Sequence, residues 1–142
     1  MSDEQNNKIS NGMNPVVHFE LPAVDTARMN EFYAKVFGWQ TKSMGPQMGD
    51  YIVATTTEVD EATQRPKVAG AINGGFFKKS EKNAYPTVVI AVDDIKASME
   101  MVKQAGGTII SGPDAIPMVG DYVAFTDTEG NRIAMLQPSS MM

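Results

Sequence analysis

One short motif occurs twice in this chain. Gly49-Asp50-Tyr51, followed by apolar residues and a threonine, recurs as Gly120-Asp121-Tyr122 in the same kind of context. Each half of the chain also opens with an apolar segment that leads to an acidic residue. An internal repeat indicates that one supersecondary unit is present more than once. We therefore expect two similar modules related by a pseudo-twofold axis, with a ligand site between or within their sheets.

Composition narrows the range of functions. The chain has 142 residues, the size of one domain, and a net charge of −5 with no run of basic residues, which argues against a nucleic-acid partner. No apolar stretch approaches the roughly 20 residues that span a bilayer. The first 14 residues are polar and lack the apolar core of a signal peptide. The absence of cysteine fits a reducing compartment. We expect a cytoplasmic protein that does not enter a membrane.

Hydrophobic periodicity and turn residues predict the elements of the first half. The chain starts with a flexible tail, residues 1–14. A helix over residues 26–37 begins at the N-cap Asp25 and ends at Gly38. Its predicted buried stripe consists of Met29, Phe32, Val36 and Phe37. The predicted strands cover residues 16–21, 39–44, 51–57 and 68–77, with a polar loop over 58–67.

The second half repeats this order. Asp93 or Asp94 caps a helix that reaches about Ala105, with a stripe of Ala97 or Ser98, Met101, Val102 and Ala105. The predicted strands cover residues 87–92, 108–111, 122–126 and 132–137. The predicted fold class is therefore α+β, with two tandem βαβββ modules whose curved mixed sheets form a cleft. A single domain over residues 15–138 consists of module one (15–77), a linker (78–86) and module two (87–138).

Strand alternation assigns side chains to the face that the helices leave open. In the first strand Val17, Phe19 and Leu21 pack under the helix, so His18 and Glu20 point the other way. Asn73-Gly74-Gly75 forms either a bulge with exposed backbone donors or a plain turn. The predicted ligand-binding residues are His18, Glu20, Tyr51, Asn73, Thr87 and Tyr122.

His18, the only histidine, allows several interpretations. A histidine and a carboxylate on one face can hold a metal or share a proton. Equally, His18 can be a buried structural residue, and Glu20 can form a salt bridge with Arg132 or Lys42. If His18 and Glu20 touch, we expect Glu20 to favour the protonated imidazole, so that ligand affinity changes between about pH 5 and 8.

These motifs resemble the vicinal oxygen chelate superfamily, which includes glyoxalase I, extradiol dioxygenases, fosfomycin-inactivating transferases and bleomycin-binding proteins. The resemblance covers about residues 15–138. In detail the chain is similar to small glyoxalase-like proteins of unassigned substrate. The segments that carry the likeness are Val17-His18-Phe19-Glu20, Phe37-Gly38-Trp39, Ile72-Asn73-Gly74-Gly75 and the turn Asp127-Thr128-Glu129-Gly130-Asn131 with the strand after it.

The resemblance implies a divalent metal, held by His, Gln or Glu at four strand positions, that chelates neighbouring oxygens of a substrate. The first position carries His18, but two others carry Thr87 and Ala134. The fourth lies within residues 68–77, which contain no His, Asp, Glu or Gln. Glu20 is a second candidate ligand, and a partner subunit is a further source that the sequence leaves open. Without a partner, the set stays below the three protein ligands that a site needs. We expect no cofactor, with a divalent metal as the less favoured alternative.

Three functions remain open. The first is a metal-independent protein that binds a small organic molecule in its cleft. The second is an enzyme, a metal-dependent lyase or dioxygenase with a rearranged site built on His18 and Glu20. The third is a resistance protein that sequesters a drug. In each case the resemblance favours a homodimer, and symmetric dimers are the commonest oligomers in general.

Overall fold

The computed structural model describes residues 12–117 and 119–139. They form two compact units: residues 18–87, here called the N-terminal unit, and residues 88–117 and 119–139 with 12–17, here called the C-terminal unit. Most of the predicted N-terminal tail, residues 1–11, lies outside the described residues. No helix in the described part of the chain is long and apolar enough to cross a membrane.

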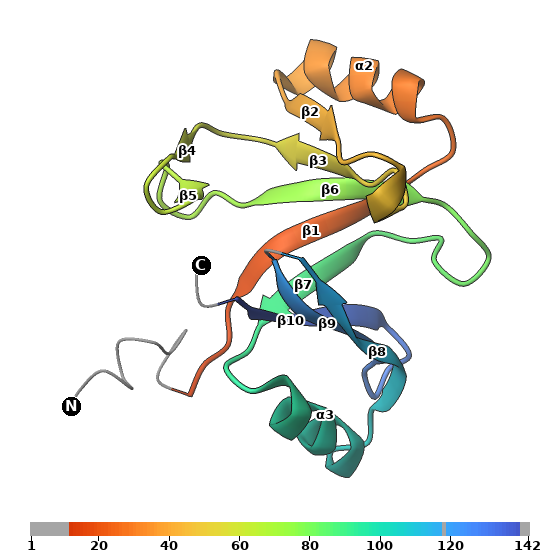
Figure 1. Cartoon of the computed structure of the whole chain (residues 1–142). Coiled ribbons are helices and arrows are strands. Elements are labelled where there is room, and N and C mark those ends of the chain that lie inside the picture. The colour runs from red at the N-terminus through yellow and green to blue at the C-terminus, as the bar shows by residue number, and fades with distance from the viewer. Residues whose placement is uncertain (1–11, 118, 140–142) are drawn as a thin grey trace. The chain divides into compact units, whose positions relative to one another are not determined.

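The N-terminal unit has the order strand, helix, strand, strand, strand. Its strands lie in the order β2-β3-β6-β1, with β1 parallel to β6 and β3 antiparallel to β6. Figure 1 shows α2 along one side of these strands and the β4–β5 hairpin beyond the end of β3. The elements are β1 (Val16–Ala23), α2 (Thr26–Phe37), β2 (Gln40–Ser43), the 3-10 turn η1 (Pro46–Met48), β3 (Ile52–Thr55), β4 (Val59–Asp60), β5 (Arg65–Pro66) and β6 (Asn73–Lys78).

The C-terminal unit repeats this arrangement. Its strands lie in the order β7-β10-β9-β8, with β10 parallel to β7 and antiparallel to β9. The elements are β7 (Thr87–Ala91), α3 (Ile95–Gln104), β8 (Thr108–Ile116), β9 (Gly120–Thr126) and β10 (Arg132–Pro138). The predicted α+β class is confirmed. The first half departs from the predicted βαβββ order by the added β4–β5 hairpin. The tandem modules, their pseudo-twofold relation and the cleft stay predictions.

The helices begin where the sequence predicts. Asp25 accepts a hydrogen bond from the backbone N–H of Arg28 at 3.0 Å, and Asp94 accepts one from Ala97 at 3.1 Å. These carboxylates satisfy backbone donors that the first helical turn leaves unpaired. Gly38 ends α2 at φ 74°, a left-handed conformation that glycine adopts at little cost.

The predicted buried stripe of α2 is wrong in part. Tyr33 and Met29 pack against the core of Ala23, Ile52, Ala54 and Phe76. Phe32, Val36 and Phe37 are instead 53%, 56% and 60% exposed. The same shift occurs in α3, where Ile95, Met99 and Val102 face the core and Met101 is exposed. In both helices the apolar residues occupy more of the circumference than the core covers.

Three strand predictions also need correction. β1 does not stop before Pro22, because its pairing with β6 continues to Ala23. The predicted loop over residues 58–67 contains the β4–β5 hairpin. Asn73-Gly74-Gly75 is neither a bulge nor a turn, since these residues pair with His18, Phe19 and Glu20 in unbroken register.

Candidate functional site

Three predicted site residues form a hydrogen-bonded triad on the open face of the N-terminal unit. The hydroxyl of Tyr51 donates to Oε2 of Glu20 at 3.1 Å and lies 2.9 Å from Nε2 of His18. His18 and Glu20 are two residues apart on β1 and therefore share a face. Phe19 between them points to the helix side and contacts Trp39, with ring centroids 5.5 Å apart. The predicted alternation of β1 thus describes His18, Phe19 and Glu20, whereas Val17, predicted to pack under the helix, is 38% exposed.

The Tyr51 side chain extends across β6 to contact His18 and Glu20 on β1. It stands two residues before Val53 and so shares its face, and Val53 and Glu20 both pair with Gly75 from opposite sides. A Cβ atom at Gly75 would overlap the Tyr51 hydroxyl. The lack of a side chain at Gly75 therefore leaves the space in which Tyr51 contacts His18 and Glu20. Sequence reasoning singled out this glycine as a possible irregularity and missed its role.

The loop before β3 fixes the position of Tyr51. Its carbonyl oxygen accepts a hydrogen bond from the backbone N–H of Met44 at 2.8 Å, and its N–H donates to Met48 at 3.2 Å. Gly45, Gly49 and Asp50 all have positive φ, which the tight turn requires. In the second copy of the motif Tyr122 lies inside β9. The two copies of Gly-Asp-Tyr thus differ in local structure.

Burial sets the charge state of the triad. Burial lowers the pKa of His18 below its ordinary value of 6.5, and the negative charge of Glu20 offsets this only in part. Desolvation disfavours the charged imidazole more than the neighbouring carboxylate favours it. Glu20 thus favours the protonated imidazole, as predicted, but burial outweighs this effect and the net shift of the His18 pKa is downward.

Asn73 lies beside the triad and also holds the end of β3. Its Oδ1 accepts hydrogen bonds from the N–H groups of Thr56 at 2.7 Å and Thr57 at 3.3 Å, and from the Thr56 hydroxyl at 3.0 Å. Asn73 pairs with His18 across β6 and β1. Its ligand-binding role stays a prediction, and its contacts give it a structural role as well.

The other two predicted residues have different surroundings. Thr87 is 4% exposed, and its hydroxyl donates to the carbonyl oxygen of Tyr85 at 3.3 Å. Tyr122, in the C-terminal unit, packs against the apolar cluster of Val89, Ala134 and Leu136. Neither is among the partners of the triad in the described hydrogen bonds. Their contact with a ligand stays a prediction.

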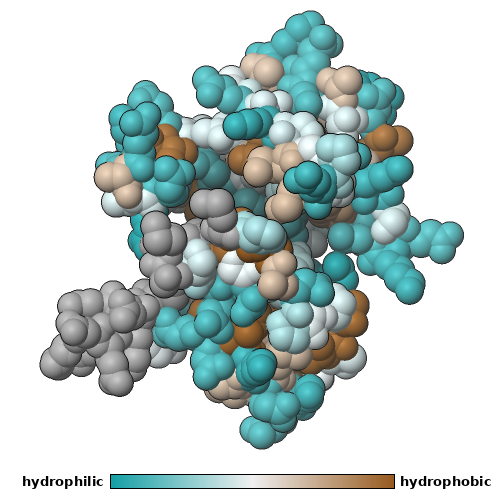
Figure 2. All heavy atoms as spheres, in the orientation of Figure 1, coloured by the Kyte–Doolittle hydropathy of each residue, from teal (hydrophilic) through white to brown (hydrophobic). Residues whose placement is uncertain are grey.

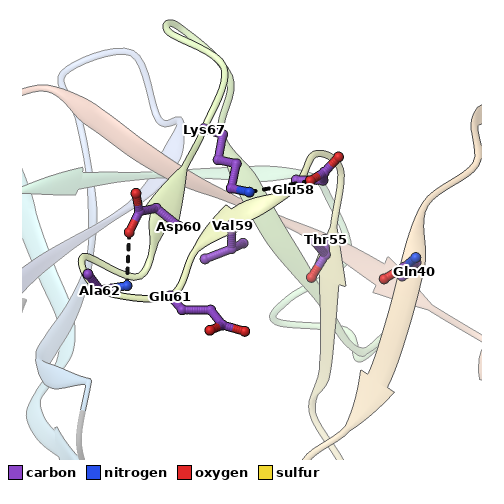
Figure 3. Close-up of a pocket in the computed structure, with 8 residues that line it drawn as sticks. All are labelled: Gln40, Thr55, Glu58, Val59, Asp60, Glu61, Ala62 and Lys67. Carbon is purple, nitrogen blue, oxygen red and sulfur yellow. Dashed lines mark hydrogen bonds and ion pairs between the residues drawn. The ribbon is translucent and has the colours of Figure 1, made fainter.

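A hollow of about 640 Å³ lies beside the β4–β5 hairpin (Figure 3). Thr55 and Gln40 line it and pair in register; Thr55 shares the open face with Val53. Figure 2 shows mainly hydrophilic residues over the hairpin. Sequence reasoning missed this feature because residues 58–67 look like a plain polar loop. Its lining is Gln40, Thr55, Glu58, Val59, Asp60, Glu61, Ala62 and Lys67.

Charged side chains make the hairpin side of the hollow acidic. Lys67 forms an ion pair with Glu58 at 3.5 Å, and both side chains are largely exposed. Asp60 accepts a hydrogen bond from the N–H of Ala62 at 2.8 Å, and Figure 3 shows Glu61 extending from the hairpin. The exposed ion pair adds little stability, since such pairs contribute about 0–1 kcal/mol.

The described residues do not fit a divalent metal. His18 and Glu20 are the candidate donors on this face, and the structure ties both to the hydroxyl of Tyr51. Across residues 12–117 and 119–139, no group of three His, Cys, Asp or Glu side chains is placed to hold an ion. Ala134, where the resemblance implies a ligand, is 0% exposed within an apolar cluster. Two donors fall short of the three or more that protein metal sites use.

Comparison with known proteins identifies the family. The model for the Glyoxalase/Bleomycin resistance protein/Dioxygenase superfamily matches residues 16–135. A probable lactoylglutathione lyase of Vibrio cholerae serotype O1 is 28% identical over 124 residues, which span 86% of this chain and 89% of that protein. A glyoxylase-like domain-containing protein of Didymella fabae is 32% identical over 120 residues, 82% of this chain and 88% of that protein.

Solved structures agree on the fold. A methylmalonyl-CoA epimerase of Streptomyces coelicolor, in complex with 2-nitronate-propionyl-CoA, aligns with a TM-score of 0.65. The alignment covers 92% of this chain and 98% of the epimerase at 13% sequence identity. At this identity the likeness concerns the fold alone.

Proposed function

Because the chain belongs to the glyoxalase/bleomycin resistance protein/dioxygenase superfamily, we propose that it binds a small organic molecule through His18, Tyr51 and Glu20, without a metal ion. The triad is the observation that carries this proposal. Three polar side chains from distant parts of the sequence converge there, and Gly75 leaves the room that their meeting needs. A few convergent polar groups on a partly apolar surface are typical of small-molecule sites.

Burial supports a functional reading of the triad. Glu20 is 9% exposed and His18 is half-buried, so both lose solvation in the folded protein. Groups with a perturbed pKa and a specific charged neighbour are candidates for functional sites. The lowered pKa of His18 meets this criterion, and Glu20 is the neighbour.

A ligand screen tests the proposal. Small polar and aromatic fragments are added to the isotope-labelled protein, and the imidazole resonances of His18 are followed by NMR. Since His18 is the only histidine, its signals need no assignment by mutation. We expect some fragments to shift them and His18→Gln to weaken binding of those fragments, with a melting temperature within a few degrees of the wild type.

Two outcomes would count against the proposal. One is a complete screen in which no fragment shifts His18. The other is a His18→Gln variant that loses stability and keeps its fragment affinity, because that result would make His18 structural. Lys96→Gln is a control variant on α3, far in sequence from the triad, and should leave fragment binding unchanged.

The metal part of the proposal has its own measurement. We expect the purified protein to contain much less than one Zn²⁺, Ni²⁺, Fe²⁺ or Mn²⁺ per chain by elemental analysis. Nearly one ion per chain, lost in His18→Ala, would contradict the metal-independent reading and favour a rearranged metal site.

A lyase is the second candidate function, and one observation favours it. The relative from Vibrio cholerae carries the description probable lactoylglutathione lyase and aligns over 89% of its length. The assay follows formation of lactoylglutathione by absorbance, with and without added divalent metal. Turnover that depends on metal and on both His18 and Glu20 would replace the binding function by this one.

A further inference from the structure

We propose that the triad holds the proton of neutral His18 on Nε2 and presents Nδ1 as an acceptor to a ligand with a weakly acidic N–H or O–H beside a carbonyl oxygen. This inference rests on the proposed function, because it names the class of small molecule that the same site takes. Imides, primary amides and hydroxy ketones belong to this class.

The first step is the direction of the hydrogen bonds. A tyrosine hydroxyl has one proton to donate and lone pairs to accept with. Tyr51 donates that proton to Glu20. The contact of the same oxygen with Nε2 of His18 at 2.9 Å therefore needs its proton from the ring. In a neutral imidazole the other nitrogen, Nδ1, is then an acceptor.

The second step is the access of solvent to Nδ1. His18 is half-buried, so its side chain keeps some exposed surface. Its described hydrogen bond uses Nε2. Nδ1 is therefore the ring nitrogen that the proposal assigns to a ligand.

The third step is a donor beside this acceptor. The two backbone N–H groups that bond to Asn73 Oδ1 fix the orientation of its amide, so Nδ2 is the group left to donate. Asn73 pairs with His18 on the neighbouring strand and shares its face. Asn73 is half-buried as well, so its side chain also keeps some exposed surface. The acceptor His18 Nδ1 and the donor Asn73 Nδ2 therefore lie on adjacent strands. Together they suit a ligand that carries a donor group next to an acceptor group.

The charge of Glu20 strengthens the acceptor. Glu20 polarises the Tyr51 hydroxyl, which in turn polarises the Nε2–H bond, and hydrogen bonds in such chains reinforce one another. In the described contacts His18 meets Asn73 on β6 and Tyr51 before β3. Glu20 is the charged neighbour that acts on His18.

The first experiment reads the tautomer of the only histidine by long-range ¹H–¹⁵N NMR near neutral pH. We expect the Nε2–H form in the wild type. In Glu20→Met the hydroxyl no longer donates to Glu20, and we expect it to donate to Nε2 instead, which moves the ring proton to Nδ1. The matched variant Glu100→Met, on the exposed face of α3, should keep the wild-type form. A wild type with its ring proton on Nδ1 would overturn the proposed hydrogen-bond directions. A Glu20→Met variant with the wild-type tautomer would overturn them too.

The second experiment tests the ligand class with succinimide and N-methylsuccinimide as probes. Succinimide offers an N–H beside carbonyl oxygens, and the methyl group removes only that donor. We expect succinimide to shift the Nδ1 resonance and to bind roughly tenfold more tightly, the worth of about one hydrogen bond. Equal binding of the two imides, or none by either, would show that the ligand class is wrong. A fragment screen without any hit would instead show that the proposed function is wrong.

Discussion

At the scale of single residues, the candidate site depends on a position that has no side chain. Gly75 has no Cβ, and the Tyr51 ring lies where that atom would be. The neighbouring Gly74 serves the opposite face in the same way, since a Cβ there would come within 2.5 Å of the Phe19 ring. Two adjacent glycines thus let one aromatic ring lie close to each face of β6. Their role is close approach to a side chain, and the strand is regular at both positions.

Gly75→Ala should break the triad and destabilise the fold. The new methyl group collides with Tyr51, and overpacking of this kind costs about 1–3 kcal/mol. Urea unfolding measures the loss, and the NMR tautomer of His18 should become mixed. In a Tyr51→Ala background the same Gly75→Ala change should cost much less, because the colliding ring is gone. An equal loss of unfolding free energy in both backgrounds would contradict the close approach of the Tyr51 ring to Gly75.

The lowered pKa of His18 predicts a stability that falls in mild acid. Below its ordinary value of 6.5 the unfolded chain takes up a proton at His18, while the folded protein resists it. Stability is therefore complete above 6.5 and is lost as the pH falls through the lowered folded value. Urea unfolding at about pH 7.5 and pH 5.5 measures this loss. His18→Gln should reduce the difference; an unchanged difference would assign it to other groups.

At the scale of elements, α2 shows how a packing partner chooses between two apolar faces. Its sequence allows a stripe through Phe32 and Val36 as well as one through Met29 and Tyr33. The ring of Tyr33 stacks on Trp39, with centroids 4.6 Å apart and an angle of 13°, and also contacts Phe76 at 5.6 Å. Trp39 follows the helix and lies over the core, so Tyr33 turns inward. Periodicity alone does not contain this information.

Truncations on the two faces of α2 should have different costs. Tyr33→Ala removes a ring packed on Trp39 and Phe76 and should cost about 3–5 kcal/mol, the range for large core residues. Phe32→Ala, at 53% exposure, should cost clearly less. Thermal or urea unfolding of both variants measures the contrast. Similar costs would mean that the predicted stripe, with Phe32 buried, describes the helix better.

Local signals made much of the fold predictable, and long-range contacts limited the rest. The caps Asp25 and Asp94 act within one helical turn, so the sequence shows where the helices begin. The shared face of His18 and Glu20 follows from their spacing of two. Their link to Tyr51 depends on which strands become neighbours and on a glycine in between. Neither spacing nor composition carries that information.

At the scale of the whole molecule, the four main strands of each unit pair in the same order, and the N-terminal unit adds the β4–β5 hairpin. The two units differ in chemistry. His18, Glu20 and Tyr51 are joined by hydrogen bonds in the N-terminal unit, whereas Val89, Ala134 and Leu136 form a buried apolar cluster in the C-terminal unit. The repeat thus conserves architecture, and the ionisable part of the candidate site belongs to one copy.

We predict that the protein forms a homodimer. The expectation comes from the general frequency of symmetric dimers and from the superfamily resemblance. Sedimentation equilibrium at micromolar concentration should give twice the 15.4 kDa mass of one chain. A mass of 15.4 kDa under these conditions would contradict it.

The crossing of Tyr51 over Gly75 also constrains how this sequence can change with time. Any side chain at position 75 excludes the tyrosine, and once the tyrosine is lost, position 75 is released from the need for glycine. The two positions should therefore vary together across related proteins, although 24 residues separate them. Relatives with a bulky residue at 75 should lack an aromatic residue at 51. Such pairs of residues would identify the lineages in which the sheet of the N-terminal unit has a different function.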